Sequence, residues 1–213
     1  KFRRGTRAPE PHLIFVGRLK AYKNVEALFD VLEQVPGAIL DVVGEGDHRP
    51  DLEAEIRRRG LGERVRMHGY VDEETKAELY GRAWVNLTAS QSEGWSLTVM
   101  EAALCGTPST ALAVGGLAES IVHGETGFLA DDRRELTERV RELVADPALR
   151  DRMGDAAERR ARTFTWDRSA RAFLEVLRRV AGKGAPAEPG PAPVSLNGHS
   201  HESRHDDEHR SRA

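Results

Sequence analysis

The chain has 213 residues, a formal net charge of −3 and a hydrophobic fraction of 39%. A charge this close to neutral provides no strong basic field for nucleic acid or an anionic membrane, and no apolar run approaches the roughly 20 residues that a membrane-spanning helix needs. The single cysteine, Cys105, excludes a disulfide framework and favours a reducing compartment. We therefore expect a cytoplasmic protein that does not bind nucleic acid.

Composition divides the chain into three parts. Residues 1–11 are basic and contain two prolines, which predicts a linker. Residues 12–181 are long enough to bury a full core. In residues 182–213, Pro, Gly and Ala give way to Ser, His and mixed charge, which predicts a disordered tail. The chain begins with Lys1 rather than Met, so we expect a fragment or a processed product.

The tail contains four histidines that nothing orders as metal ligands. A transition metal would bind them weakly at best, so we expect a solvated tail and no metal site in the chain. These residues are His199, His201, His205 and His209.

Strands and helices are predicted to alternate along residues 12–130. Short apolar runs predict six strands, at 12–17, 38–43, 65–68, 84–88, 109–112 and 127–130. Helical periodicity predicts helices between them, the first capped by Asn24, with others at 51–59, 72–80 and 96–104. Because no hairpin signal separates the strands, the pattern is that of a Rossmann-like, doubly wound parallel sheet of the α/β class.

The remaining residues up to 181 are predicted to be helical. Two helices are expected at 134–145 and 148–162, on either side of Asp146-Pro147. A third starts at Thr165 and carries an apolar stripe from Trp166 to Val180, which must pack on something.

The stretch 92–108 combines a turn, a helix start and two carboxylates. Gly94 is its flexible point and Ser96 a candidate N-cap, while Glu93 precedes the helix and Glu101 lies within it. We expect the side of the helix that carries Glu101 and Leu97 to be partly buried, where an unpaired charge is costly.

Two interpretations of this stretch stay open. A helix N-terminus suits a phosphate, and ionised carboxylates accept hydrogen bonds from sugar hydroxyls. Alternatively, the stretch is a core helix with one capping carboxylate and one surface salt bridge.

Polar groups follow several predicted strands, and ligands of open parallel sheets bind at the carboxyl ends of strands. Arg18 and Lys23 follow the first strand, and the Glu93 loop follows the fourth. Gly44-Glu45-Gly46 is no dinucleotide fingerprint, because Arg49 stands where a third glycine is needed, and the chain has no Walker-type loop. Two cations, a helix N-terminus and two carboxylates fit a nucleotide-diphospho-sugar as substrate, with no cofactor. Surface charges remain the alternative for the two cations.

These residues resemble the donor half of glycosyltransferase family 4, which has the GT-B architecture. The resemblance covers residues 12–180, in the order of that family. The matching pieces are Val16-Gly17-Arg18, Lys23, Glu93-x7-Glu101, Cys105-Gly106-Thr107-Pro108, Gly115-Gly116-Leu117-Ala118-Glu119 and Gly124-Glu125-Thr126-Gly127-Phe128-Leu129.

The resemblance implies a role for each matching residue. Arg18 and Lys23 would neutralise the donor diphosphate, Glu93 would contact the transferred sugar, and Glu101 would hold the ribose hydroxyls. These roles make Arg18, Lys23 and Glu93 the catalytic candidates. The implied donor-binding residues are Gly17, Val71, Glu73, Lys76, Gly94, Trp95, Ser96, Leu97, Thr98 and Glu101.

The resemblance also implies a retaining, metal-independent transfer to an acceptor hydroxyl. Fixed cations stabilise the negative charge that develops on the leaving diphosphate, a role that a divalent metal fills elsewhere. Trp95 replaces a common Phe and Ser96 a common Gly, and a tryptophan there would narrow the sugar pocket. His68 and His123 are expected to be structural. The Glu73 carboxylate could accept hydrogen bonds from the N–H groups of guanine, which hints at a GDP-sugar as the donor.

A GT-B enzyme has two Rossmann-like domains, and the resemblance covers only the C-terminal, donor-binding one. We expect the N-terminal acceptor domain to be a partner absent from this chain, with any peripheral membrane association occurring through it. The isolated chain should bind a nucleotide-sugar weakly without turnover. A non-catalytic nucleotide-sugar-binding module with the same fold is the alternative. A GT-B epimerase is a third, which the paired glutamates disfavour.

Overall fold

The computed structural model describes residues 2–182. Of the predicted disordered tail, 183–213 with its four histidines lies outside the described residues. The chain divides into two units, with the boundary between Thr165 and Trp166. The first unit contains the sheet, and the second contains one described helix, α8 (Trp166–Val180).

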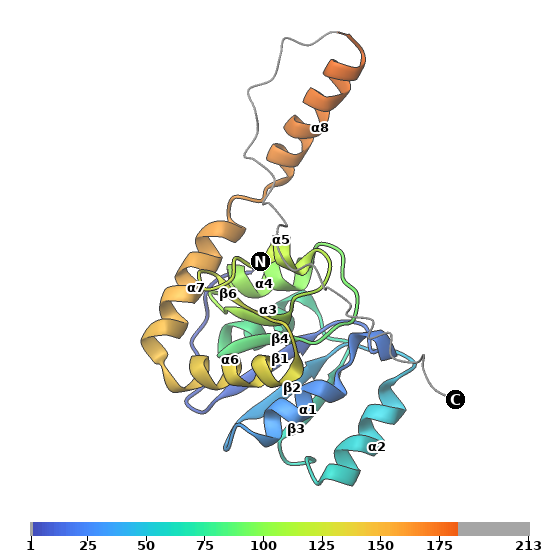
Figure 1. The fold of residues 1–213 in the computed structure, drawn as a ribbon, viewed down its shortest axis with the longest axis vertical. Helices are drawn as coiled ribbons and strands as arrows, with labels where there is room; N and C mark the ends of the chain where they lie inside the picture. Colours follow the sequence, from blue (N-terminus) through green and yellow to red (C-terminus); the bar gives the residue numbers. More distant parts are fainter. Residues whose placement is uncertain (1, 183–213) are drawn as a thin grey trace, which may run out of the picture. The chain divides into compact units, whose positions relative to one another are not determined.

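Six parallel strands form one sheet in the order β3-β2-β1-β4-β5-β6 (Figure 1). They are β1 (His12–Val16), β2 (Ile39–Val43), β3 (Val65–Gly69), β4 (Val85–Thr88), β5 (Ser109–Leu112) and β6 (Gly127–Ala130). Every neighbouring pair is parallel, which confirms the predicted doubly wound α/β fold. The apolar runs are buried because helices cover both faces of the sheet.

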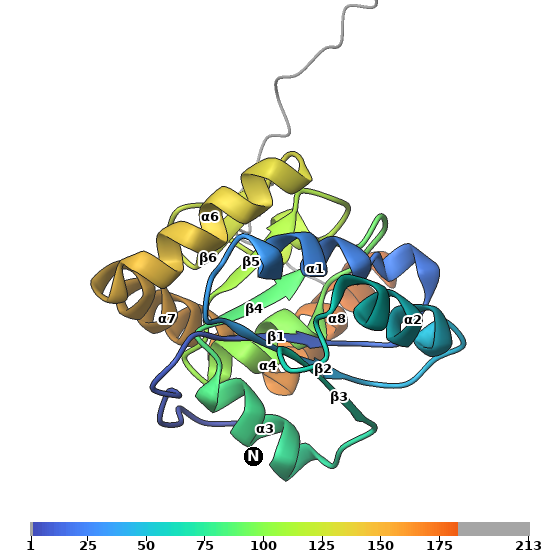
Figure 2. The ribbon, with the colours of Figure 1, turned by 90° about the horizontal axis from the view of Figure 1, so that it is seen from below.

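The helices alternate with the strands, as predicted. They are α1 (Glu26–Glu33), α2 (Arg49–Arg59), α3 (Glu73–Arg82), α4 (Leu97–Leu104), α5 (Leu117–Ser120), α6 (Arg133–Ala145) and α7 (Pro147–Ala161), with a short 3₁₀ helix η1 (Ala21–Lys23). The largest core cluster joins α1, α2 and α6 to the sheet. Apolar residues of α3 and α4 pack with Ile14 and Val43 in another cluster. Figure 2 shows α1 and α6 on one side of the sheet and α3 on the other.

Three local predictions differ from the structure. Asn24 does not cap the first helix: it takes the left-handed conformation after η1, and Val25 is the N-cap of α1. Asn both caps helices and tolerates positive φ, so its residue type did not distinguish the two roles. Glu101 and Leu104 are partly buried, as we expected for their side of α4, but Leu97 on the same side is 67% exposed. Helices η1 and α5 were not predicted, because each is too short to show periodicity.

The predicted linker lies along the first unit from Phe2 onward. Ala8 is buried, its N–H donates to the carbonyl of Arg82 at 3.0 Å, and its own carbonyl accepts from Trp84 Nε1 at 2.8 Å. Arg4 pairs with Asp155 of α7. The stretch therefore contacts the end of α3, the start of β4 and the side of α7.

Helix α8 carries the predicted apolar stripe and buries none of its residues. Trp166 is 90% exposed and Phe173 is 67% exposed. That this stripe packs on another surface stays a prediction. Within residues 2–182, no helix combines the length and the apolarity needed to traverse a bilayer.

Candidate functional site

The candidate site lies where the order of strands reverses direction. From β1 the chain first adds β2 and β3 on one side, and β4, β5 and β6 then follow on the other. Ligands of open parallel sheets bind at the carboxyl ends of the strands next to such a reversal, here beside the loops that follow β1 and β4. These two loops carry Lys23 and Glu93.

Lys23 and Glu93 form an ion pair between these two loops. The Lys23 ammonium pairs with Glu93 Oε1, and the two side chains are 14% and 17% exposed. The same carboxylate oxygen accepts a hydrogen bond from the buried Ser90 hydroxyl at 2.8 Å. Glu93 is thus a half-buried carboxylate with two donors on one oxygen, and within residues 2–182 no donor to its other oxygen is found.

Backbone hydrogen bonds tie the two loops together next to this ion pair. The N–H of Gln91 donates to the carbonyl of Tyr22 at 2.8 Å. Asn24, at φ 52°, donates from Nδ2 to the carbonyl of Ala89 at 3.2 Å and accepts from Arg133. Asn24 therefore joins the end of β4 to the loop after β1, a role that its interpretation as a cap missed.

Glu101 is held by a second lysine, from α3. Lys76 Nζ lies 3.0 Å from Glu101 Oε1, with the two side chains 20% and 23% exposed. The hydroxyl of Tyr80 donates a long hydrogen bond, 3.5 Å, to Glu101 Oε2. Tyr80 is fully buried. Burial first, and then the charge of Glu101, raise the pKa of Tyr80 well above its ordinary value, so the phenol stays a donor.

Two glycines support the Glu93 loop from behind. The N–H of Gly116 donates to the carbonyl of Glu93 at 3.0 Å. Gly115 has φ 50°, and a Cβ there would lie 2.1 Å from that same carbonyl oxygen; a Cβ on Gly116 would lie 2.7 Å from the backbone of Gly94. Only glycines permit this approach. The pair therefore fixes the backbone of the loop.

Helix α4 begins at the end of this loop, as predicted. Ser96 is its N-cap, and the Ser96 hydroxyl accepts from the N–H of Val99 at 3.4 Å. The N–H of Ser96 donates to the Ser120 hydroxyl. Among residues 2–182, the amides of Leu97 and Thr98 have no acceptor, so they are the groups available to an anion at this terminus.

Trp95 packs on a residue beyond α7. Its ring centroid lies 5.1 Å from that of Phe164, and the two rings are tilted by 60°. Both rings are partly exposed, at 39% and 43%. The tip of the Glu93 loop is thus anchored to the end of the first unit.

The remaining candidates lie around these two pairs. Arg18 is exposed where the chain leaves β1, and the structure brings it into neither ion pair. Gly17 donates from its N–H to the carbonyl of Val43 at 3.0 Å. Val71 is half-buried before α3, and Glu73 follows the N-cap Asp72.

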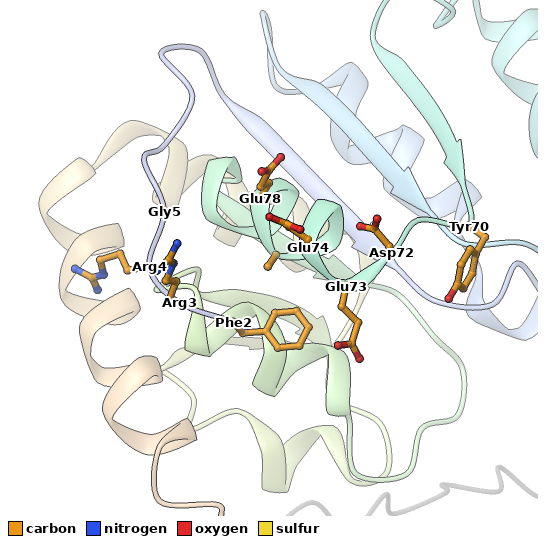
Figure 3. A pocket seen from close by; sticks show the side chains of 10 residues that line it. Phe2, Arg3, Arg4, Gly5, Tyr70, Asp72, Glu73, Glu74 and Glu78 are labelled. Carbon is orange, nitrogen blue, oxygen red and sulfur yellow. The ribbon is translucent and has the colours of Figure 1, made fainter.

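Glu73 also lines a cavity of about 880 Å³ between α3 and the first residues of the chain. Figure 3 shows its carboxylate and the Phe2 ring at this cavity, with Tyr70 on the far side. Glu73, the residue implied to accept from the base, therefore borders an open volume.

Sequence reasoning missed two side chains of the site, Tyr80 and Ser90. Tyr80 lies four residues after Lys76, so its position on the same face of α3 was a usable signal. Ser90 lies three residues before Glu93 in a loop, where spacing carries no such signal. Within the described residues, no three His, Cys, Asp or Glu side chains are grouped to hold a metal ion.

Comparisons with known proteins identify the family of this chain. The family described as "Glycosyl transferases group 1" matches residues 1–160. D-inositol 3-phosphate glycosyltransferase of Xylanimonas cellulosilytica is 34% identical over 181 residues, which cover 82% of this chain and 43% of that protein. The chain thus spans less than half the length of this relative.

Two solved structures share the fold. Sucrose-phosphate synthase from Thermosynechococcus elongatus is 31% identical with a TM-score of 0.76, over 83% of this chain and 47% of that one. Anabaena HepE in complex with UDP-glucose is 25% identical with a TM-score of 0.74, over 81% of this chain and 50% of that one.

Proposed function

Because the chain belongs to the group 1 glycosyl transferases, we propose that it forms the donor-binding half of a transferase. The enzyme transfers a sugar from a nucleotide-diphospho-sugar to an acceptor hydroxyl. The proposal rests on one observation above all: two half-buried glutamates at the carboxyl edge of the sheet are each paired with a lysine from another element.

The pairing suits a ligand that carries both negative charge and hydroxyl groups. A diphosphate attracts Lys23 and the free amides at the start of α4, which releases Glu93 to accept hydrogen bonds from the sugar. Glu101, with Lys76 beside it, accepts from the ribose hydroxyls. The structure of HepE with UDP-glucose supports a nucleotide-sugar as the ligand.

In this mechanism the positively charged side chains stabilise the leaving diphosphate. As the bond between the anomeric carbon and the phosphate oxygen breaks, negative charge grows on the leaving diphosphate. Arg18 and Lys23 stabilise that charge more in the transition state than in the ground state. We propose that the reaction retains the anomeric configuration and needs no metal. The acceptor site belongs to a part of the protein outside this chain.

A calorimetric titration tests the proposal. The chain is titrated with UDP, GDP and ADP, each with and without Mg²⁺. We expect saturable binding of one nucleotide, unchanged by Mg²⁺ and weakened about tenfold or more by Arg18→Ala or Lys23→Ala, since each removes a charge-assisted contact. Lys20→Ala is the matched control: Lys20 lies between the two residues but pairs with the exposed Asp47.

The same titration identifies the base of the preferred nucleotide and tests whether binding depends on a metal ion. Binding of GDP alone would support the hint from Glu73, whereas binding of UDP alone would remove it. Binding only with Mg²⁺ would contradict metal independence. If no nucleotide binds, the donor site is not formed in this chain and the proposal fails for it.

A further inference from the structure

The first residues of the chain contact the backbone of α3 unusually closely. A Cβ on Gly5 would lie 2.8 Å from the Cα of Gly81, and one on Gly81 would lie 2.9 Å from the Cα of Gly5. Arg7 donates to the carbonyls of Ala83 and Gly106, both at 2.8 Å. These contacts hold the segment 2–8 against the end of α3, so its side chains have defined neighbours.

Phe2 uses this placement to contact two side chains of the candidate site. Lys76 Nζ lies 5.1 Å from the centroid of the Phe2 ring, within the range of a cation–π interaction. The Phe2 and Tyr80 rings meet edge to face, with centroids 6.2 Å apart and planes at 67°. Figure 3 shows the Phe2 ring at the wall of the cavity that Glu73 also lines.

Lys76 and Tyr80 are the two residues that hold Glu101. They lie four residues apart on one face of α3, and each contacts a different oxygen of the Glu101 carboxylate. The lysine stem has several rotatable bonds, so a ring against its ammonium restricts the positions that it samples. Phe2 therefore contacts both side chains that hold the Glu101 carboxylate.

We propose that Phe2 is a positioning residue of the nucleotide site: it holds Lys76 and Tyr80 in the geometry in which Glu101 receives the ribose. The inference rests on the proposed function. It goes further by making the segment before β1, and not only the strand-end loops, part of the donor site. Movement of that segment then changes nucleotide affinity.

The test is a comparison of nucleotides with and without ribose hydroxyls. Phe2→Ala should weaken binding of the preferred nucleoside diphosphate about threefold to tenfold, the range of a partly exposed cation–π contact. Its affinity for the 2′,3′-dideoxy analogue should not change, because that analogue presents no hydroxyl to Glu101. Phe2→Trp retains a ring over Lys76 and should restore the ribose preference. A purely structural role would lower both affinities together.

A double-mutant cycle separates this inference from the proposed function. In the Glu101→Gln background, Phe2→Ala should cause no further loss, because the two residues act on the same contact. Arg4→Ala is the control on the same segment, since it removes the ion pairs with Asp155 and Glu158 of α7 and leaves both ring contacts of Phe2 in place. Thermal unfolding of each variant confirms that it is folded.

The outcomes are distinguishable. If Glu101→Gln weakens nucleotide binding but Phe2→Ala does not, the role of Phe2 is wrong and the proposed function stands. Equal losses of the ribose and dideoxy nucleotides in Phe2→Ala would also overturn the inference. If the unmodified chain binds no nucleotide, the proposed function fails and this inference fails with it.

Discussion

The Glu93 and Glu101 carboxylates, each paired with a lysine, are held by different parts of the fold. Glu93 lies in an irregular loop whose backbone is defined by neighbours from elsewhere: the carbonyl of Tyr22, the side chain of Asn24 and the glycine pair 115–116. Glu101 lies within α4, where its own helix fixes the backbone, and only its side chain needs partners from α3.

The difference shows how one site combines adaptability with rigidity. A loop held by a few contacts opens at low cost, whereas a helix in the core opens only with its surroundings. We expect the sugar end of the donor site to adjust to its ligand and the ribose end to be preformed.

Gly115→Ala should disrupt the Glu93 side most strongly. The new Cβ would lie 2.1 Å from the carbonyl oxygen of Glu93, at φ 50°, so the loop must move. We expect nucleotide affinity to fall at least about tenfold and stability to fall by about 2 kcal/mol or more.

Gly124→Ala is the matched control: its φ is 78°, but nothing lies within 4 Å of its Cβ. It should cost only about 1 kcal/mol of backbone strain and leave binding intact. Calorimetry and urea unfolding measure the two effects, and equal effects in the two variants would contradict the role of the glycine pair.

Removing each lysine in turn should separate local from global effects. Lys23→Met should increase hydrogen exchange of the amides at 89–96 about tenfold while leaving the midpoint of thermal unfolding nearly unchanged, because only the loop loses a contact. Lys76→Met should instead lower global stability by about 1 kcal/mol, because α3 and α4 lose a contact between them. Mass-resolved hydrogen exchange with thermal unfolding checks both. The same pattern in both variants would remove the distinction between loop and helix.

Tyr80→Phe tests the Glu101 side through pH. Burial and then Glu101 raise the pKa of Tyr80 well above the ordinary value of 10.0. The folded chain thus retains a proton that the unfolded chain loses, and stability falls as the pH rises above about 10. Tyr80→Phe should lack this alkaline loss, while below about pH 9 its stability should lie within about 1 kcal/mol of the original, because the 3.5 Å hydrogen bond is long.

Urea unfolding at several pH values measures this difference. Burial raises the pKa of Cys105 to about 11, so Cys105 causes an alkaline loss of stability in both proteins, and only the difference between their pH curves reports on Tyr80. Parallel pH curves for the two proteins would contradict the assigned state of Tyr80.

The difference between the Glu93 loop and the Glu101 helix also explains which parts of the site could be predicted from the sequence. The strands and most helices were predicted because apolar runs and helical periodicity are local signals, and strands separated by helices favour a parallel sheet. The position of Glu101 on α4 follows from the same periodicity. The exposure of Leu97 could not be predicted, because spacing defines a face of a helix but not what covers it.

The loop side of the site depends on contacts that leave little trace in sequence. The bond from Gln91 to the carbonyl of Tyr22 is between backbones, and any residues could form it. Asparagine occurs both as a helix N-cap and in the left-handed conformation, so the residue type of Asn24 led to the wrong N-cap for α1. The adjacent glycines 115 and 116 were a usable signal, since two such residues indicate a close backbone approach. The functional roles of the individual site residues stay predictions until they are measured.

The pairing of β1 with β4 has a consequence for how the chain folds. Leu13 pairs with Val85 and Ile14 with Asn86, so this central contact closes a long loop that contains β2, β3, η1 and three α-helices. Such non-local pairing is slow compared with helix formation. Lys23 and Glu93 follow these two strands, so they meet only after the pairing has formed. In a refolding experiment, the capacity to bind a nucleotide should therefore appear later than the helical signal.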